Sequence, residues 1–193
     1  MAAIPFTARA GRDRRSSGAA KGFSLIEIMV VIAIIALVGA VVVPQLSYIA
    51  GVELKSSART LAGTIRITYA TAVTSRNFYR LVFDLNERSY RVEKKQGAAY
   101  VAADEPLLQG RVLAESVYFK AVDVAGEVCQ ADSNCAAVIY FTPGGYMEEA
   151  AVYIATIDDA QTISLFTRPM TGRSVILAGE VPFQEYLDQE EEQ

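Results

Sequence analysis

The chain has 193 residues, 52% of them hydrophobic, and contains no histidine. Without histidine it lacks the usual general base and the commonest nitrogen ligand of metals, so we expect no enzyme, no cofactor and no metal site. The formal charge of -4 is unevenly divided, because residues 1–22 hold five of the 18 Lys and Arg residues and one of the 22 Asp and Glu residues. The 13 basic and 21 acidic residues that follow show no basic stripe, so we expect no binding to nucleic acid.

Residues 1–22 are rich in Ala, Gly, Ser and Arg, which is typical of a cytoplasmic leader outside any folded domain. Residues 23–43 follow with Glu27 as their only charge. A helix of this length reaches roughly 30 Å, enough to cross a bilayer core. Basic residues before such a segment stay in the cytoplasm, so we predict a single-pass membrane helix with the remaining chain outside. A cleaved secretory signal is the competing interpretation, but the run ends at Pro44 without a small-residue cleavage pattern.

The amphipathic pattern after Pro44 predicts that the helix continues outside the membrane over residues 44–76. Residues of one helical face recur at steps of four and three: Leu54, Ala58, Leu61, Ile65, Thr68 and Ala72. Because proline lacks the amide proton that a helix interior uses, we expect a kink or a locally melted turn at Pro44.

Residues 77–180 have the composition of a β-rich globular domain. Short β-branched and aromatic runs predict strands at 80–84, 89–94, 112–119, 137–141, 151–157, 162–167 and 173–177. Turn residues separate several of them, so the expected fold class is α+β, with the long N-terminal helix packed on antiparallel sheet. Residues 181–193 are strongly acidic and are expected to form a solvated, disordered tail, with a docking role as the alternative.

The segment Lys21-Gly22-Phe23-Ser24-Leu25-Ile26-Glu27 resembles the signal of type IV prepilins. The resemblance implies that a prepilin peptidase cuts after Gly22 and methylates the new amine of Phe23. A carboxylate at position 27 costs roughly 2.5 kcal/mol or more in the membrane unless it is partnered or reaches the interface. In pilins the corresponding acid is thought to meet the N-terminal amine of a neighbouring subunit, which implies an assembly role for Glu27. An acid that merely reaches the interface is the alternative.

Two later segments narrow the resemblance. Residues 137–146, AVIYFTPGGY, and 165–175, LFTRPMTGRSV, resemble the strand and turn elements of the GspH/FimT family of minor pseudopilins and pilins. The resemblance implies a pilin-like fold and a minor pseudopilin that helps initiate or cap a type II secretion pseudopilus for protein export. A minor type IV pilus subunit for pilus biogenesis or DNA uptake is the alternative. As plain structure, both segments are tight turns.

The same resemblance implies the partners and the location of the chain. Its partners would be other major and minor pseudopilins or pilins, the prepilin peptidase and the inner-membrane assembly platform. The chain would be anchored in the bacterial inner membrane, with its N-terminus in the cytoplasm and its C-terminal domain in the periplasm.

Cys129 and Cys135 flank a short polar segment on the expected oxidising side of the membrane. A small disulfide loop fits this arrangement, and free thiols are the alternative. Closing so short a loop would add about 2 kcal/mol through chain entropy.

Overall fold

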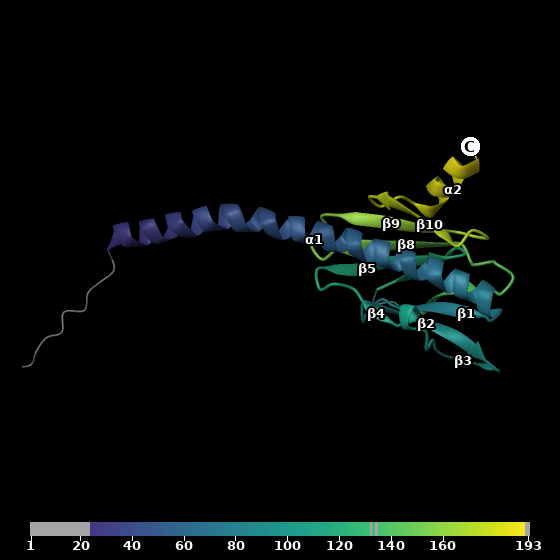
Figure 1. The fold of residues 1–193 in the computed structure, drawn as a ribbon. Coiled ribbons are helices and arrows are strands. Elements are labelled where there is room, and N and C mark those ends of the chain that lie inside the picture. The colour runs from purple at the N-terminus through teal and green to yellow at the C-terminus, as the bar shows by residue number, and fades with distance from the viewer. Residues whose placement is uncertain (1–23, 132, 134, 192–193) are drawn as a thin grey trace, which may run out of the picture. The chain divides into compact units, whose positions relative to one another are not determined.

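A computed structural model describes residues 24–131, 133 and 135–191. For residues 40–49 and 189–191 it describes the backbone alone. Helix α1 (Leu25–Ser75) is followed by ten strands, the short 3-10 helix η1 (Pro106–Leu108) and helix α2 (Phe183–Glu191), as Figure 1 shows. The chain divides into two compact units, residues 1–41 and 42–193.

The part of helix α1 that belongs to the second unit has one buried face. The six residues predicted to share that face, Leu54, Ala58, Leu61, Ile65, Thr68 and Ala72, are all buried, so this prediction is confirmed. The helix ends where Arg76 takes a positive φ of 52° and the Asn77 amide donates to the Ala72 carbonyl at 3.2 Å. The amphipathic half of α1 therefore supplies one wall of the domain core.

The first sheet is antiparallel and has the strand order β3-β2-β1-β7, with β4 pairing on β2. Its strands are β1 (Tyr79–Asp84), β2 (Ser89–Gln96), β3 (Ala99–Ala102), β4 (Arg111–Val112) and β7 (Ala137–Phe141). Alternate residues of β1, such as Leu81 and Phe83, join the core with α1.

The second sheet is also antiparallel, with the order β10-β9-β8-β5-β6. Its strands are β5 (Val117–Val124), β6 (Glu127–Gln130), β8 (Ala150–Thr156), β9 (Thr162–Arg168) and β10 (Arg173–Ala178). In Figure 1 α1 crosses both sheets, and residues of both sheets share one core cluster with it. The predicted α+β fold class, with a long N-terminal helix packed on antiparallel sheet, is confirmed.

The single strand predicted over 112–119 is wrong. The chain instead leaves the first sheet after β4 and enters the second sheet at β5. Between them the Leu113 amide donates to the Arg88 carbonyl at 2.8 Å, and the Val117 amide closes a turn onto the Ala114 carbonyl at 3.1 Å. The segment 112–119 thus contributes to two sheets. Strands β3 and β6 were not predicted.

The disordered tail predicted for the acidic end is also wrong, because residues 183–191 form α2. Phe183 and Tyr186, three positions apart, lie on one face of this helix and are buried. The Tyr186 ring stacks on Phe166 with centroids 4.2 Å apart, and Arg168 Nε donates to the Tyr186 hydroxyl at 3.1 Å. Two aromatic side chains therefore order a segment whose overall composition is acidic.

Candidate functional site: the N-terminal segment of α1 and the turns that meet at Tyr69

The first turn of α1 contains the acid of the N-terminal motif. The Ser24 carbonyl accepts hydrogen bonds from the amides of Glu27 at 3.0 Å and Ile28 at 3.2 Å, which fixes the start of the helix. Glu27 is exposed and lies where the helix dipole favours a negative charge.

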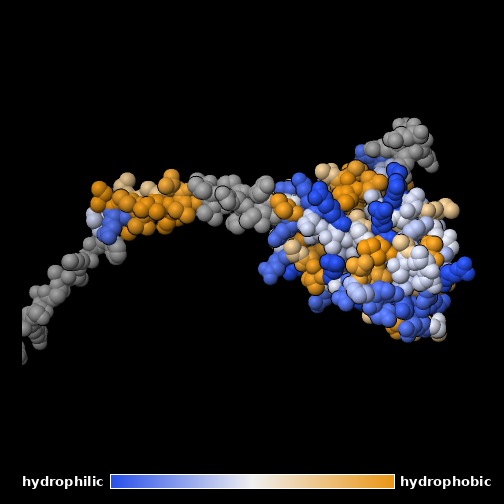
Figure 2. All heavy atoms as spheres, in the orientation of Figure 1, coloured by the Kyte–Doolittle hydropathy of each residue, from blue (hydrophilic) through white to orange (hydrophobic). Residues whose placement is uncertain are grey.

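The surface that follows Glu27 is apolar on all sides. Every residue from 24 to 38 is exposed, and apart from Ser24 and Glu27 all are hydrophobic. Leu25, near the start of this segment, is 79% exposed, and Leu37, near its end, is 71% exposed. A helix that is hydrophobic all round is normally covered by lipid or by other helices. Figure 2 shows this segment as a continuous hydrophobic surface.

Other predicted positions of the motif lie partly or wholly outside the described residues. Gly22 and Phe23, the predicted cleavage and methylation site, precede them. Position 44 belongs to α1, which is assigned as one helix from Leu25 to Ser75, but the Pro44 side chain is not described, so the kink stays a prediction. Among the helix residues with described side chains, no stretch is both long enough and apolar enough to span a membrane.

Cys129 and Cys135 are joined by a disulfide, with their Cα atoms 5.8 Å apart. The bond closes the loop after β6 beside β7 and borders a groove of about 520 Å³. Glu127 and Glu148 line this groove together with apolar side chains. Among the described residues no group of three or more potential metal ligands occurs.

The two turns that resemble the GspH/FimT family meet at one side chain of α1, Tyr69. Its hydroxyl lies 2.9 Å from the Gly145 carbonyl oxygen and 2.8 Å from the Met170 carbonyl oxygen, so a single proton is shared between two turns. Gly145 and Gly172 both have a positive φ, of 80° and 65°. A Cβ at Gly172 would lie 2.7 Å from Cγ of Tyr69, so only glycine admits the ring this close.

Sequence reasoning missed Tyr69 as the residue that joins these segments. The turns lie 76 and 101 residues away from it along the chain. Its place one position after the buried face residue Thr68 was the only available signal. The arrangement is a structural clamp that fixes both turns on α1.

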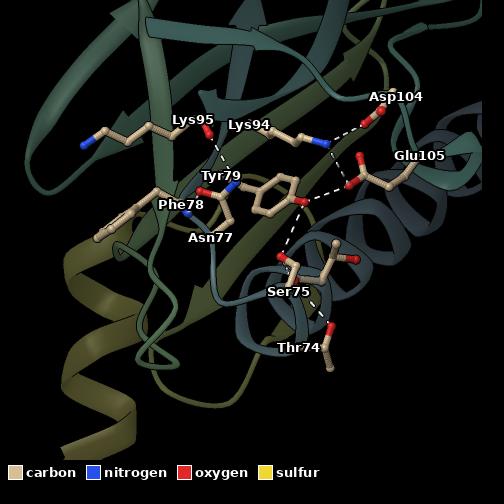
Figure 3. Close-up of polar contacts among 10 residues, drawn as sticks. Thr74, Ser75, Asn77, Phe78, Tyr79, Lys94, Lys95, Asp104 and Glu105 are labelled. Carbon is tan, nitrogen blue, oxygen red and sulfur yellow. Dashed lines mark hydrogen bonds and ion pairs between the residues drawn. The ribbon is translucent and has the colours of Figure 1, made fainter. Parts of the chain in front are cut away.

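A polar cluster holds the C-terminal end of α1 against the first sheet (Figure 3). The Tyr79 hydroxyl donates to a Glu105 carboxylate oxygen at 2.7 Å, and Ser75 Oγ lies 3.5 Å from the same hydroxyl. Lys94 pairs with Asp104 at 2.7 Å and lies 3.8 Å from Glu105. Burial is the main cause that raises the pKa of Tyr79 above 10, so the phenol stays protonated near neutral pH. The cluster is thus suited to anchoring the helix rather than to nucleophilic chemistry.

A family model described as the prokaryotic N-terminal methylation motif matches residues 18–43. Two solved structures of the minor pseudopilin EpsH from the type 2 secretion system of Vibrio cholerae are similar at 14% identity. Both alignments cover 67% of this chain; they cover 99% and 97% of the EpsH chains, with TM-scores of 0.56 and 0.55. No curated protein sequence matches the chain.

The motif match begins before the predicted cleavage position and extends to the last residue before Pro44. The structural matches cover 67% of the chain and carry the fold assignment. The chain therefore carries the prokaryotic N-terminal methylation motif ahead of a domain that has the fold of the EpsH minor pseudopilin structures.

Proposed function

We propose that the chain is a minor subunit of a type II secretion pseudopilus that helps initiate or cap the filament for protein export. The observation that carries this proposal is the exposed, wholly apolar segment 28–38 directly after Glu27, joined to a pilin-like domain. Such a surface needs a cover, which the bilayer supplies before assembly and neighbouring helices supply afterwards. The similar structures come from a type 2 secretion system, which favours secretion over a pilus.

In this proposal residues 1–22 are removed and the amine of Phe23 is methylated. Residues 23–43 hold the subunit in the inner membrane, and the domain lies in the periplasm. The proposal needs no catalytic role for the chain, in keeping with its lack of histidine.

Glu27 explains how the subunit would be selected for assembly. A carboxylate in hydrocarbon costs roughly 2.5 kcal/mol or more, and the freed amine of a neighbouring Phe23 can neutralise it. When two subunits align the Glu27 carboxylate with the Phe23 amine, the two charges neutralise each other and this cost is removed. When the subunits are misaligned, the cost remains. The acid would thus set the register between neighbouring helices.

Mass spectrometry of the mature N-terminus tests the processing step. We expect a chain that begins at Phe23 with one added methyl group. A chain that still carries residues 1–22 in cells with an active prepilin peptidase would contradict the proposal, because the amine that pairs with Glu27 would not exist.

Copurification tests assembly. We expect Glu27→Ala to remain membrane-bound and processed but to lose its association with the other pilin-like subunits, together with secretion. Unchanged association would instead support a tethered domain that never polymerises. Loss of piliation with normal secretion would favour the type IV pilus alternative.

A further inference from the structure

A basic groove runs between α1 and the edge strand β10, and we name it the basic furrow. It consists of two hollows of about 450 and 360 Å³ that are each lined by residues of both α1 and β10, and of a hollow of about 550 Å³ on α1 that shares Lys55 and Arg59 with the first. Its cationic side chains are Lys55, Arg59, Arg66 and Arg173. Its apolar floor includes Leu54, Ile163, Ile176 and Ala178. The expectation that no basic cluster follows the leader is therefore wrong.

The helix places three of these cations in one row. Lys55, Arg59 and Arg66 are spaced by four and seven residues, so they lie on one side of α1 over roughly 16 Å. Arg173 joins them from β10, more than a hundred positions later in the sequence. Only folding brings the fourth cation to the row. Figure 2 shows hydrophilic and hydrophobic atoms interleaved over the region where α1 and β10 lie in Figure 1.

The charge of the furrow is not neutralised within the described part of the chain. All four cations are exposed, none takes part in a salt bridge among the described residues, and no acidic residue lines the three hollows. The nearby Glu180 is bound to Lys120 at 2.7 Å. The region after the leader has eight more acidic than basic residues, so an unpaired basic row is a local reversal of charge.

The acidic helix α2 of the same chain does not fill the furrow. It packs with Phe166 and Val175, whereas the neighbouring residues Leu165 and Ile176 alternate to the opposite face of the second sheet. The hollow that contains Ile176 thus lies on the face that α2 does not cover.

We propose that the basic furrow binds an acidic, amphipathic segment of a neighbouring pilin-like subunit, an inference that rests on the proposed function. Carboxylates on one side of such a segment would meet the row of cations, and its apolar side would cover the floor at Ile163 and Ile176. A nucleic acid fits less well, because no aromatic side chain lines the furrow to stack on bases and the floor is apolar. The furrow would act as a second recognition site outside the membrane, separate from Glu27.

Photocrosslinking in cells tests this inference with the full chain. A benzoylphenylalanine residue replaces Ile176 in the floor, and the matched control replaces Val128, an exposed residue of β6. The co-encoded subunits that carry the same N-terminal motif are expressed with it. We expect the Ile176 position to crosslink to an acidic segment of one of these subunits, identified by mass spectrometry, and the Val128 position not to give this product.

Charge variants decide whether the cations cause the contact. We expect Arg59→Glu combined with Arg66→Glu to reduce the crosslinked product about tenfold or more, and the corresponding double Gln variant to reduce it less. Arg111→Glu is the control, because Arg111 is exposed beside the other flank of α1. These positions are exposed, so the variants should fold normally.

A crosslink that survives the double Glu variant would overturn the inference. So would the absence of a specific product at Ile176. A product that contains only DNA, lipid or a second copy of this chain would overturn it as well. The N-terminus and the Glu27→Ala phenotype are measured in the same cells. A processed, assembled subunit without the crosslink refutes the furrow alone, whereas an unprocessed chain refutes the proposed function.

Discussion

Gly172→Ala tests whether the Tyr69 clamp holds the two turns on α1. Alanine at a positive φ costs roughly 1 kcal/mol. The added Cβ would also overlap the Tyr69 ring, which cannot withdraw without loosening its contacts with the carbonyls of Gly145 and Met170. Crowding of this kind adds roughly 1–3 kcal/mol. We therefore expect a total loss of roughly 2–4 kcal/mol in the free energy of unfolding.

Gly97→Ala is a matched control. Gly97 has a φ of 61°, close to the 65° of Gly172, but nothing lies within 4 Å of the position where its Cβ would be. The Gly97→Ala substitution should lower the free energy of unfolding by only the backbone cost of roughly 1 kcal/mol. For a chain of this size each kcal/mol lowers Tm by about 2–4 °C. Circular dichroism of the detergent-solubilised variants should thus show a Tm loss for Gly172→Ala two to four times that of Gly97→Ala.

A double-mutant cycle isolates the clamp itself. If the ring causes the extra loss, Tyr69→Ala together with Gly172→Ala should be less destabilising than the sum of the two single variants, by roughly 1–3 kcal/mol. Equal losses for Gly172→Ala and Gly97→Ala, or additive single variants, would show that the close approach of Tyr69 does not constrain the turn.

Three further predictions concern the domain. Burial raises the pKa of Glu93, but hydrogen bonds from its two arginine partners outweigh burial and hold the pKa below 4.5. Its stabilisation should be complete above pH 4.5 and disappear as the pH falls below, so Glu93→Gln should flatten that part of the Tm-against-pH curve. Replacing Cys129 and Cys135 by Ser should cost about 2 kcal/mol in urea unfolding, and reductant should no longer affect the variant. Tyr186→Ala should cost about 2 kcal/mol or more and expose the α2 segment to proteolysis, whereas Gln184→Ala should not.

The periodic parts of the fold were predictable because local pattern and burial coincide. Each of the six residues on the predicted face of α1 is buried, since a helix that packs on one side repeats its apolar positions with the helical period. The strand at residues 137–141 was predicted with its observed bounds, because β-branched and aromatic residues are flanked there by turn residues.

Features that depend on tertiary contacts were not predictable. The run 112–119 reads as one strand, but its two ends belong to different sheets, and sheet membership is not a local property. Helix α2 was hidden by its acidic composition, because Phe183 and Tyr186 gain their stabilisation only from Phe166 on β9. The basic furrow was missed although Lys55, Arg59 and Arg66 share one side of the predicted helix; only Arg173 meets this row through folding.

Tyr69 gives a physical reason for the two turn motifs to occur in the same chain. A turn that approaches an aromatic ring on α1 needs a residue without a Cβ at its tip, and both turns place a glycine there with a positive φ. The Tyr69 hydroxyl donates to a carbonyl of each turn, so the position of one turn depends on the position of the other through this side chain. The turn that contains Gly172 leads directly into Arg173 and β10, the strand that borders the basic furrow. The clamp therefore fixes one wall of the furrow relative to the row of cations on α1, and a loosened Tyr69 should weaken recognition at the furrow even though it touches no partner.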